Sequence, residues 1–348
     1  MTENQIQQLI IHGKFPDNQV CQELKQTHIS WVILCKDYVY KIKKPVNLTF
    51  LDFSTLEKRK YFCEQELTLN QRLTSDLYLD VYPILLDHET YFLGPGTGKI
   101  VDYSVVMRRL DNSKEMSKLL LKRKVRKADM KKIAKQLAYF HQTTEIIKGK
   151  LTPELLIEDF NDIQQIQSFI TNNIDKAASM QLSEIISFVT YFINENAALI
   201  LKRDREGFTR DCHGDLHSGN IFLLDHPVVF DCIEFNKHFR QIDILSELAF
   251  FCMDLEIFQR NDLSKCFLNY YTKEFQVIRN KNEERLFLFY KLYRANVKAK
   301  INAIKTQQAS DPEEKELRLG LFMKYFQLFL HYYQLLEKGT DEKIRASA

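Results

Sequence analysis

Three polar side chains in one short stretch of the chain have the types and the spacing that transfer of a phosphoryl group requires. Asp215 stands in a His-Gly-Asp triplet, Asn220 follows five positions later, and Asp231 comes directly after the apolar run Val-Val-Phe. Phosphoryl transfer from a nucleotide needs one group that receives the proton of the acceptor hydroxyl, and oxygen ligands that hold Mg²⁺ against the phosphates. The stretch therefore predicts a kinase.

The positions of these side chains favour a binding site over chance assembly. Asp231 ends a predicted strand, where a buried carboxylate usually serves a metal or a polar network. Gly214 and Gly219 lie beside Asp215 and Asn220, and glycine lets the backbone approach a ligand closely. A binuclear metallophosphoesterase is the rival class, because the same loop imitates its Asp-x-His and Gly-Asn motifs. However, one short loop cannot supply groups that such a site draws from several strand ends around two metals.

The elements that must position these residues are predicted from periodicity and turn signals. The first third of the chain alternates short β-rich runs with turns, and nearly everything after residue 118 is helical apart from the segment around Asp215. Ser54 with Glu57 three residues later predicts a capping box and a helix over residues 55–73. We expect strands at residues 31–35 and 38–42, joined as a hairpin, and at residues 79–86, 91–93 and 100–110.

An ion pair is predicted between this hairpin and this helix. Glu66 falls within the apolar stripe of the helix, so its carboxylate needs a partner. Lys41 projects inward from its strand, and each residue can satisfy the other. A strand lysine held by a helix glutamate is the device with which kinases grip the α- and β-phosphates of the nucleotide. Lys43 shares the face of Lys41, so either lysine can fill this role; two independent surface residues are the alternative.

The glycine-rich segment 94–99 resembles a phosphate-binding loop but lacks its pattern. A Walker A loop needs Gly five positions before the Gly-Lys pair and Ser or Thr after it, and these positions hold Leu93 and Ile100. We therefore predict a hairpin turn. The next strand leads from the β-rich part to the helical part, and its backbone from Met107 to Leu110 is the expected hinge for adenine. An ordinary connection between lobes is the alternative.

The order His-Gly-Asp, four residues, Asn, then a short strand ending in Asp resembles the aminoglycoside phosphotransferase-like branch of the protein-kinase superfamily. The resemblance implies that Asp215 is the catalytic base and that Asn220 and Asp231 are the magnesium ligands. It also implies that His217 takes the place of a phosphate-binding lysine. Two further residues are implied to brace the catalytic loop, namely His213 and Asp243.

The resemblance extends along most of the chain and implies its fold. It implies an α+β, bilobal protein-kinase-like fold, with a small antiparallel β-rich N-lobe at residues 1–110 that binds the nucleotide. The large, mainly helical C-lobe is expected at residues 111–348, with the catalytic loop and the metal site. The chain looks most like a bacterial branch whose members are often fused to a C-terminal P-loop kinase domain, and it is expected to end without one. The other matching segments are residues 28–32, 39–45, 51–56, 137–141 and 290–295.

Composition and charge bound the class of protein but name no partner. The 49 Lys and Arg residues against 46 Asp and Glu leave a formal charge of +3, far below what a nucleic-acid-binding face concentrates. The seven cysteines are scattered, so neither a disulfide framework nor a zinc site is indicated. The polar N-terminus does not resemble a signal peptide, and no apolar stretch approaches the length of a membrane span. We expect a cytoplasmic protein that binds neither nucleic acid nor membrane; the oligomeric state is not predicted.

Two predicted helices carry many charges, and they favour acceptors of opposite charge. A predicted helix at residues 153–172 is acidic, which would favour a cationic acceptor, and a later long helix is basic along one side, which would favour an anionic one. For both helices an exposed, solvated face is the simpler interpretation, so the acceptor is not identified. The residues concerned are Glu154, Glu158, Asp159 and Asp162 in the first helix, and Lys291, Arg294, Lys298 and Lys305 in the second.

The sequence thus predicts a phosphotransferase that uses ATP or another nucleoside triphosphate, with Mg²⁺, and acts on a hydroxyl of a small molecule. The alternative is a nucleotide-binding regulator or toxin-like protein that uses the kinase scaffold without small-molecule turnover. The complete set of Asp215, Asn220 and Asp231 weighs against that alternative. A protein acceptor is disfavoured, because the helices predicted at residues 153–172 and 182–203 would wall the acceptor cleft and leave little open groove.

Overall fold

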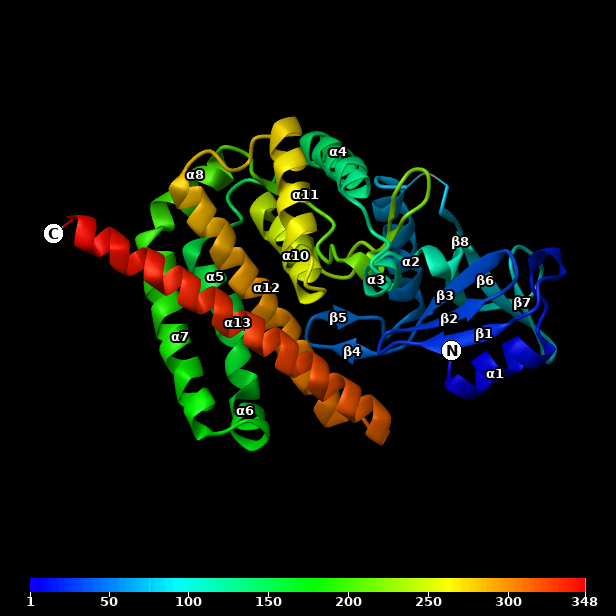
Figure 1. Ribbon diagram of the computed structural model, residues 1–348. Helices are drawn as coiled ribbons and strands as arrows, with labels where there is room; N and C mark the ends of the chain where they lie inside the picture. The colour runs from blue at the N-terminus through cyan, green and yellow to red at the C-terminus, as the bar shows by residue number, and fades with distance from the viewer. Residues whose placement is uncertain (75, 348) are drawn as a thin grey trace. The chain divides into compact units, whose positions relative to one another are not determined.

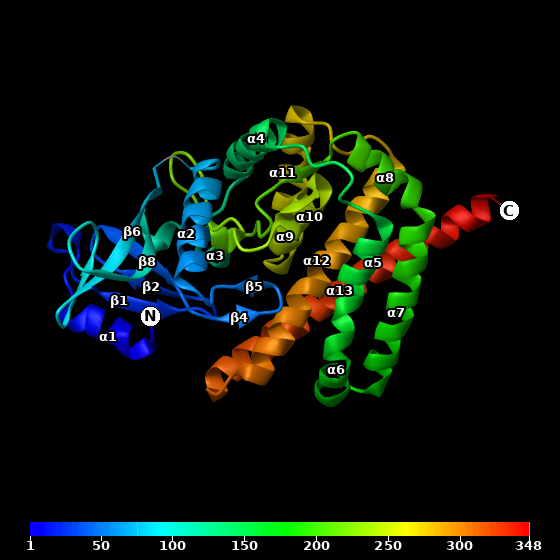
Figure 2. The same cartoon turned by 180° about the vertical axis from the view of Figure 1, so that it is seen from behind.

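The computed structural model describes residues 1–74 and 76–347, with side chains as far as residue 339. The chain divides into two compact units, which can be followed in Figures 1 and 2. Unit 1 comprises Met1–Arg123 and Gly219–Phe239, and unit 2 comprises Lys124–Ser218 and the chain from Arg240 onward. Unit 1 contains an antiparallel sheet and unit 2 is mainly helical, so the predicted α+β class is confirmed.

Unit 1 is built on a six-stranded antiparallel sheet in the order β1-β2-β3-β8-β6-β7. The predicted hairpin is present as β2 and β3, with Trp31 opposite Ile42. Successive side chains of a strand point to opposite faces. Tyr40 and Ile42 therefore pack in one apolar cluster with α1, while Val39 packs in another with α2. The bounds are β1 Glu23–Gln26, β2 Ser30–Leu34, β3 Tyr38–Lys43, β6 Tyr78–Asp87, β7 Thr90–Leu93, β8 Lys99–Arg108, α1 Glu3–His12, α2 Leu56–Gln71 and α3 Met116–Leu121.

The N-terminus of α2 differs from the prediction by one residue. The cap is Thr55, whose hydroxyl accepts a hydrogen bond from the backbone N–H of Lys58 at 3.3 Å. Ser54, the predicted cap, instead donates its hydroxyl to Asp52 at 2.6 Å. The predicted capping box of Ser54 and Glu57 is wrong, because both residue types cap helices and the hydrogen bond to Asp52 decides between them.

The glycine-rich segment 94–99 is not a hairpin turn. Strands β7 and β8 lie on opposite sides of β6 and both pair with it, so the segment crosses the end of β6 and does not join neighbouring strands. The prediction is wrong because glycine marks a change of direction and not which strands pair. Gly98 is required there: its φ is 137°, and a Cβ would lie 3.0 Å from the carbonyl oxygen of Leu86.

Two short hairpins complete the strands of unit 1. In the first, β4 (Asn47–Leu48) pairs with β5 (Leu51–Asp52). In the second, β10 (Ile221–Phe222) pairs with β11 (Val228–Val229), and this hairpin lies between Asn220 and Asp231. The predicted boundary near residue 110 would assign Asn220 and Asp231 to the helical lobe, whereas the structure groups these two residues with the sheet in unit 1.

Unit 2 is a helical bundle with one two-stranded sheet. The helices predicted at residues 153–172 and 182–203 are each interrupted: α5 passes through a 3₁₀ turn into α6, and α7 meets α8 at Asn196. Helix α10 is buried along nearly its whole length, and α13 packs along α12. The bounds are α4 Lys127–Thr143, α5 Pro153–Asn161, α6 Gln167–Asn173, α7 Lys176–Glu195, α8 Ala197–Arg205, β9 Thr209–Asp211, α9 Lys237–Arg240, β12 Gln241–Asp243, α10 Ile244–Ile257, α11 Asn261–Glu274, α12 Lys281–Gln308 and α13 Pro312–Ser347.

A helix that spans a membrane must be long enough and apolar enough to cross the hydrocarbon core. Within residues 1–74 and 76–347, no single helix meets both criteria. Helices α7 and α8 meet them only when joined across a bend of 57°.

Candidate active site

Two lysines of β3 converge on one buried carboxylate of α2. Lys41 Nζ donates to Glu66 Oε1 at 2.7 Å, and Lys43 Nζ donates to Glu66 Oε2 at 2.7 Å. The Glu66 side chain is fully buried, so each of its oxygens needs such a donor. The pairing of Lys41 with Glu66 expected from the sequence is present. The sequence left open whether Lys41 or Lys43 pairs with this glutamate, and in the structure both lysines do.

Each lysine also contacts a second carboxylate within unit 1. Lys41 Nζ lies 2.6 Å from Asp231 Oδ1, and Lys43 donates to Glu234. We call these five residues the lysine–carboxylate cluster. Lys43 is 1% exposed, Lys41 is 15% exposed and Asp231 is 43% exposed, so Lys41 and Asp231 form the side of the cluster that a ligand can reach. The sequence did not single out Glu234.

The lysines decide the charge of Glu66. Burial alone would raise the pKa of its carboxyl group, but the positive charges and hydrogen bonds of Lys41 and Lys43 lower that pKa to about 2. The carboxyl group of Glu234 shows the opposite balance: burial, helped by the negative charge of Glu66, raises its pKa despite the contact with Lys43. Glu66 is therefore the residue that stays ionised and fixes both lysines.

Unit 1 should lose stability in acid because of Glu66. The pKa of this group is about 2 in the folded chain, against 4.5 as its ordinary value. The stabilisation is therefore complete above about pH 4.5 and is lost as the pH falls towards 2, by roughly 3 kcal/mol in total. Trp31, which is the single tryptophan and lies in β2, reports unfolding of this unit by fluorescence.

The matched control for the acid experiment is Glu66→Gln. This variant should be less stable at pH 7, because two buried lysines lose their shared carboxylate. Its unfolding midpoint in urea should depend less on pH between 4.5 and 2 than that of the wild type. Equal pH dependence in the two proteins would show that Glu66 is not the group responsible.

The β10–β11 hairpin brings the two predicted metal ligands to one end. The backbone N–H of Phe230 donates to the carbonyl oxygen of Asn220 at 3.0 Å, so Asn220 and Asp231 emerge from neighbouring positions of the two strands. Their carboxamide and carboxylate oxygens are the hard donors that Mg²⁺ prefers. The predicted metal ligands thus lie close together within unit 1.

Asp231 adopts a strained backbone conformation that its surroundings hold in place. Its φ is 64°, in the left-handed region that non-glycine residues rarely occupy. The N–H of Asp231 donates to the hydroxyl of Tyr78 at 3.2 Å, and the next N–H, of Cys232, donates to the side chain of Asn70 at 2.9 Å. Strain of this kind is concentrated at functional sites, where it aims a side chain at a ligand. The sequence did not point to Tyr78 or Asn70.

In unit 2, the His-Gly-Asp turn is held by a carboxylate on α10. Gly214 has a φ of 90°, which a side chain would strain, so glycine is required in the middle of the turn. The N–H groups of His213 and Gly214 donate to Glu247 at 3.1 Å and 2.7 Å. Burial tends to raise the pKa of Glu247, but the hydrogen bond and charge of His141 lower it to about 2. Glu247 thus fixes the backbone immediately before Asp215.

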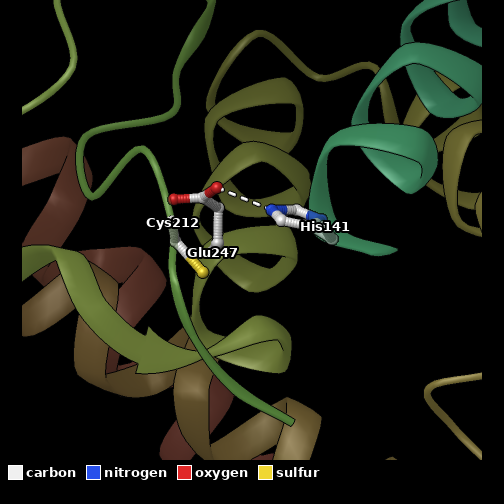
Figure 3. Close-up of side chains that lie close together, drawn as sticks. All are labelled: His141, Cys212 and Glu247. Carbon is white, nitrogen blue, oxygen red and sulfur yellow. Dashed lines mark hydrogen bonds and ion pairs between the residues drawn. The ribbon is translucent and has the colours of Figure 1, made fainter. Parts of the chain in front are cut away.

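His141 and Cys212 lie beside Glu247, as Figure 3 shows, and the three side chains carry atoms of the types that bind metal ions. His141 Nε2 lies 2.8 Å from Glu247 Oε1, which is hydrogen-bond contact and leaves no room for an ion between them. The other ring nitrogen of His141 lies 2.8 Å from the hydroxyl of Tyr271. The thiol of Cys212 donates to a backbone carbonyl at 3.7 Å. His141 and Glu247 thus form a hydrogen-bonded support for the turn, and Cys212 bonds to the backbone of another segment.

Asp243 lies at the N-terminus of α10 and holds a buried arginine. The guanidinium of Arg203 contacts both oxygens of Asp243, at 2.7 Å and 2.9 Å. Asp243 also caps the helix by accepting from the N–H of Leu245 at 2.8 Å. Its predicted bracing of the catalytic loop therefore stays a prediction, as does that of His213, whose Nδ1 lies 3.3 Å from the N–H of Asp215.

Two basic side chains flank the carboxylate of Asp215. His217 Nε2 lies 3.3 Å from Oδ2, and Lys298 Nζ lies 3.5 Å from Oδ1. Burial tends to raise the pKa of Asp215, but the positive charges of Lys298 and His217 lower it well below its usual range. Asp215 is therefore an ionised acceptor of hydrogen bonds.

The basic side of α12 is not the exposed face that its composition indicated. Lys291 binds Glu256 at 2.6 Å, Arg294 donates to the carbonyl oxygen of Gly214 at 3.3 Å, and Lys298 faces Asp215. The expectation of a solvated face is wrong for these three residues, because helical periodicity shows which side chains share a face but not which face is covered.

The predicted adenine hinge lies at the end of β8. Met107 is buried in the apolar cluster on the α2 side of the sheet, opposite Val39 of β3. Leu110 follows the strand and packs against the same cluster. Their backbone contact with adenine stays a prediction.

Comparisons with known proteins bear on the sequence and on the fold. No protein-family model matches the chain. Uncharacterised proteins of Mycobacterium tuberculosis and Mycobacterium bovis are 30% identical to it over 290 residues, which is 82% of this chain and 55% of theirs. The chain thus spans about half the length of these relatives.

Several solved structures with a similar fold are, by their titles, small-molecule kinases or phosphotransferases. A choline kinase from Cryptosporidium parvum has a TM-score of 0.53 at 13% identity, covering 92% of this chain and 91% of its own. Glucosamine kinase in complex with glucosamine, ADP and inorganic phosphate has a TM-score of 0.52 at 12% identity, covering 94% of this chain and 83% of its own. The GDP complex of aminoglycoside 2′-phosphotransferase-IIIa has a TM-score of 0.52 at 12% identity, covering 93% of this chain and 98% of its own. The chain therefore has the protein-kinase-like fold.

Proposed function

We propose that the protein is a cytoplasmic kinase that transfers the terminal phosphoryl group of ATP, with Mg²⁺, to a hydroxyl of a small molecule. The observation that carries the proposal is the contact of Lys41 with both Glu66 and Asp231. A lysine that grips phosphates, the glutamate that fixes it and a carboxylate that binds metal are the parts a kinase needs around its nucleotide. The small-molecule kinases with this fold, two of them in complex with ADP or GDP, support the proposal.

The residues of unit 1 are proposed to hold the nucleotide. Asn220 and Asp231 would bind Mg²⁺, which supplies positive charge that offsets the charge developing on the phosphates. Lys41, as the more exposed of the two lysines, would contact the α- and β-phosphates, with Glu66 fixing its position. The backbone between Met107 and Leu110 would hydrogen-bond the adenine.

The residues of unit 2 are proposed to act on the acceptor. Asp215 would receive the proton of the acceptor hydroxyl as the oxygen attacks, and its lowered pKa means that it is ionised beforehand. His217, next to Asp215, would contact the transferred phosphate in place of a lysine. Glu247 would act through the turn, by fixing the backbone that carries Asp215.

The test is acceptor-dependent release of ADP from a panel of hydroxyl-bearing metabolites, with Asp231→Ala as the blank. We expect release from the wild type and a rate at least about 10²-fold lower from the variant, because one ligand of the charge-neutralising metal is lost. Equal release from both proteins would refute the metal assignment. Nucleotide binding without release for any acceptor would instead support a regulator on a kinase scaffold.

A further inference from the structure

We propose that the acceptor carries an anionic group, a carboxylate or a phosphate, which Lys298, Lys305 and Arg318 bind beside Asp215. We call these three residues the basic cluster. The inference rests on the proposed function for the reaction, and on the side chains of α12 and α13 for the charge of the acceptor.

The basic cluster begins at the predicted catalytic base. Lys298 and Lys305 are seven residues apart on α12, which places them on one side of the helix, about 10 Å apart along its axis. Lys298 Nζ lies 3.5 Å from Asp215 and 4.8 Å from the centre of the Phe250 ring. The row of positive charge therefore starts at the carboxylate that would receive the proton and leads away from it. An acceptor with a hydroxyl at one end and an anion at the other matches this order of charges.

Among the described side chains, two of these cations face a carboxylate, Lys298 facing Asp215 and Arg318 facing Glu314, whereas Lys305 does not. Lys305 is partly buried and has no ion-pair partner among the residues whose side chains the structure describes. Burial lowers its pKa, as do the nearby charges of Arg318 and Lys298, while Asp215 and Glu314 act in the opposite direction. The Nε of Arg318 is buried without a hydrogen-bond partner in the same described set, and its Nη2 reaches Glu314 at 3.3 Å. A partly buried cation is costly when it has no partner, and an anionic ligand would supply the partner that Lys305 lacks.

The competing acidic surface does not offer a comparable site for a cation. Glu154 and Glu158 of α5 are exposed, as a solvated helix face requires. Asp162, which follows α5, is paired with Lys300 at 2.6 Å. Of the residues behind the two opposing hints in the sequence, Lys298 of the basic group contacts Asp215 directly. Glucosamine and choline, after which two of the structural neighbours are named, are cations, so this site would select a different class of acceptor.

The experiment measures binding and turnover of paired probes. D-Glycerate and glycerol 3-phosphate are the two anionic probes, glycerol is the neutral one, and choline is the cationic one; ADP with Mg²⁺ is present in the binding assays to fill the nucleotide site. We expect both anions, or the one whose group fits, to bind at least about tenfold more tightly than glycerol or choline. Lys305→Gln and Arg318→Gln should each weaken anion binding about tenfold, whereas Lys315→Gln, at an exposed position of α13, should not.

The outcomes separate this inference from the proposed function. Preference for choline, or anion binding unchanged in Lys305→Gln and Arg318→Gln, would overturn the basic cluster as acceptor site even if ADP were released. If the wild type binds the anions, these variants do not, and no hydroxyl compound is turned over, the basic cluster is an anion site. The proposed kinase function would then be refuted. Where an anionic probe is turned over, both variants should raise its KM about tenfold and change the KM for ATP less than twofold.

Discussion

Replacing Asp215 with asparagine is expected to lower kcat by about 10²- to 10⁴-fold, the range that a general base contributes. Asparagine keeps the shape of the side chain but cannot receive a proton. The Kd for ATP should change less than about twofold, because the proposed nucleotide contacts belong to other residues. Single-turnover measurement of ADP formation, alongside nucleotide titration, separates the two quantities.

The dependence of the wild-type rate on pH provides a second readout of Asp215. Its pKa lies well below the ordinary 3.8, so the group is ionised throughout the range from pH 5 to 8. Protonation of Asp215 should therefore cause no loss of kcat as the pH falls from 8 to 5. Asp76→Asn, at an exposed turn, is the matched control and should leave kcat unchanged. A kcat for Asp215→Asn within tenfold of the wild type would exclude the role of catalytic base.

The parts of the site that could be predicted are those that local sequence encodes. The alternation of β3 and the helical spacing of α2 place Lys41 and Glu66 on facing surfaces, so their pairing follows from two short patterns. The spacing from Asn220 to Asp231 likewise fits one hairpin. Such patterns act over a few residues, and the fold contains both the contact between Lys41 and Glu66 and the hairpin between Asn220 and Asp231.

The parts that could not be predicted depend on contacts between distant segments. Glu247 binds the turn at His213 and Gly214 from a helix that is buried along nearly its whole length, so no amphipathic pattern distinguishes the side that carries it. The crossing of β6 by residues 94–99 is a matter of strand order, which turn residues do not encode. The inward orientation of Lys298 depends on which side of α12 is covered. Each of these features is set by how distant segments of its own unit pack against one another.

Replacing Glu247 with alanine is expected to destabilise unit 2 by about 3–5 kcal/mol, the usual cost of removing one partner from a buried charged network. Three donors lose their acceptor at once: the N–H groups of His213 and Gly214, and the ring of His141. The carboxylate is fully buried, so water does not replace it. Urea unfolding followed by far-UV circular dichroism reports this change, because unit 2 contains most of the helices.

Comparison of substitutions at position 247 distinguishes a support for the turn from general packing. Glu247→Gln keeps one oxygen acceptor and should cost less than Glu247→Ala, while Glu184→Gln, at an exposed position in α7, should change stability by less than about 0.5 kcal/mol. If Glu247 acts through the turn, the folded Glu247→Gln protein should lose kcat while its Kd for ATP stays near the wild-type value. A variant that is less stable yet retains full kcat would show that Glu247 stabilises α10 without positioning Asp215. Loss of kcat beyond the fraction unfolded would show that the backbone held by Glu247 sets the position of the base.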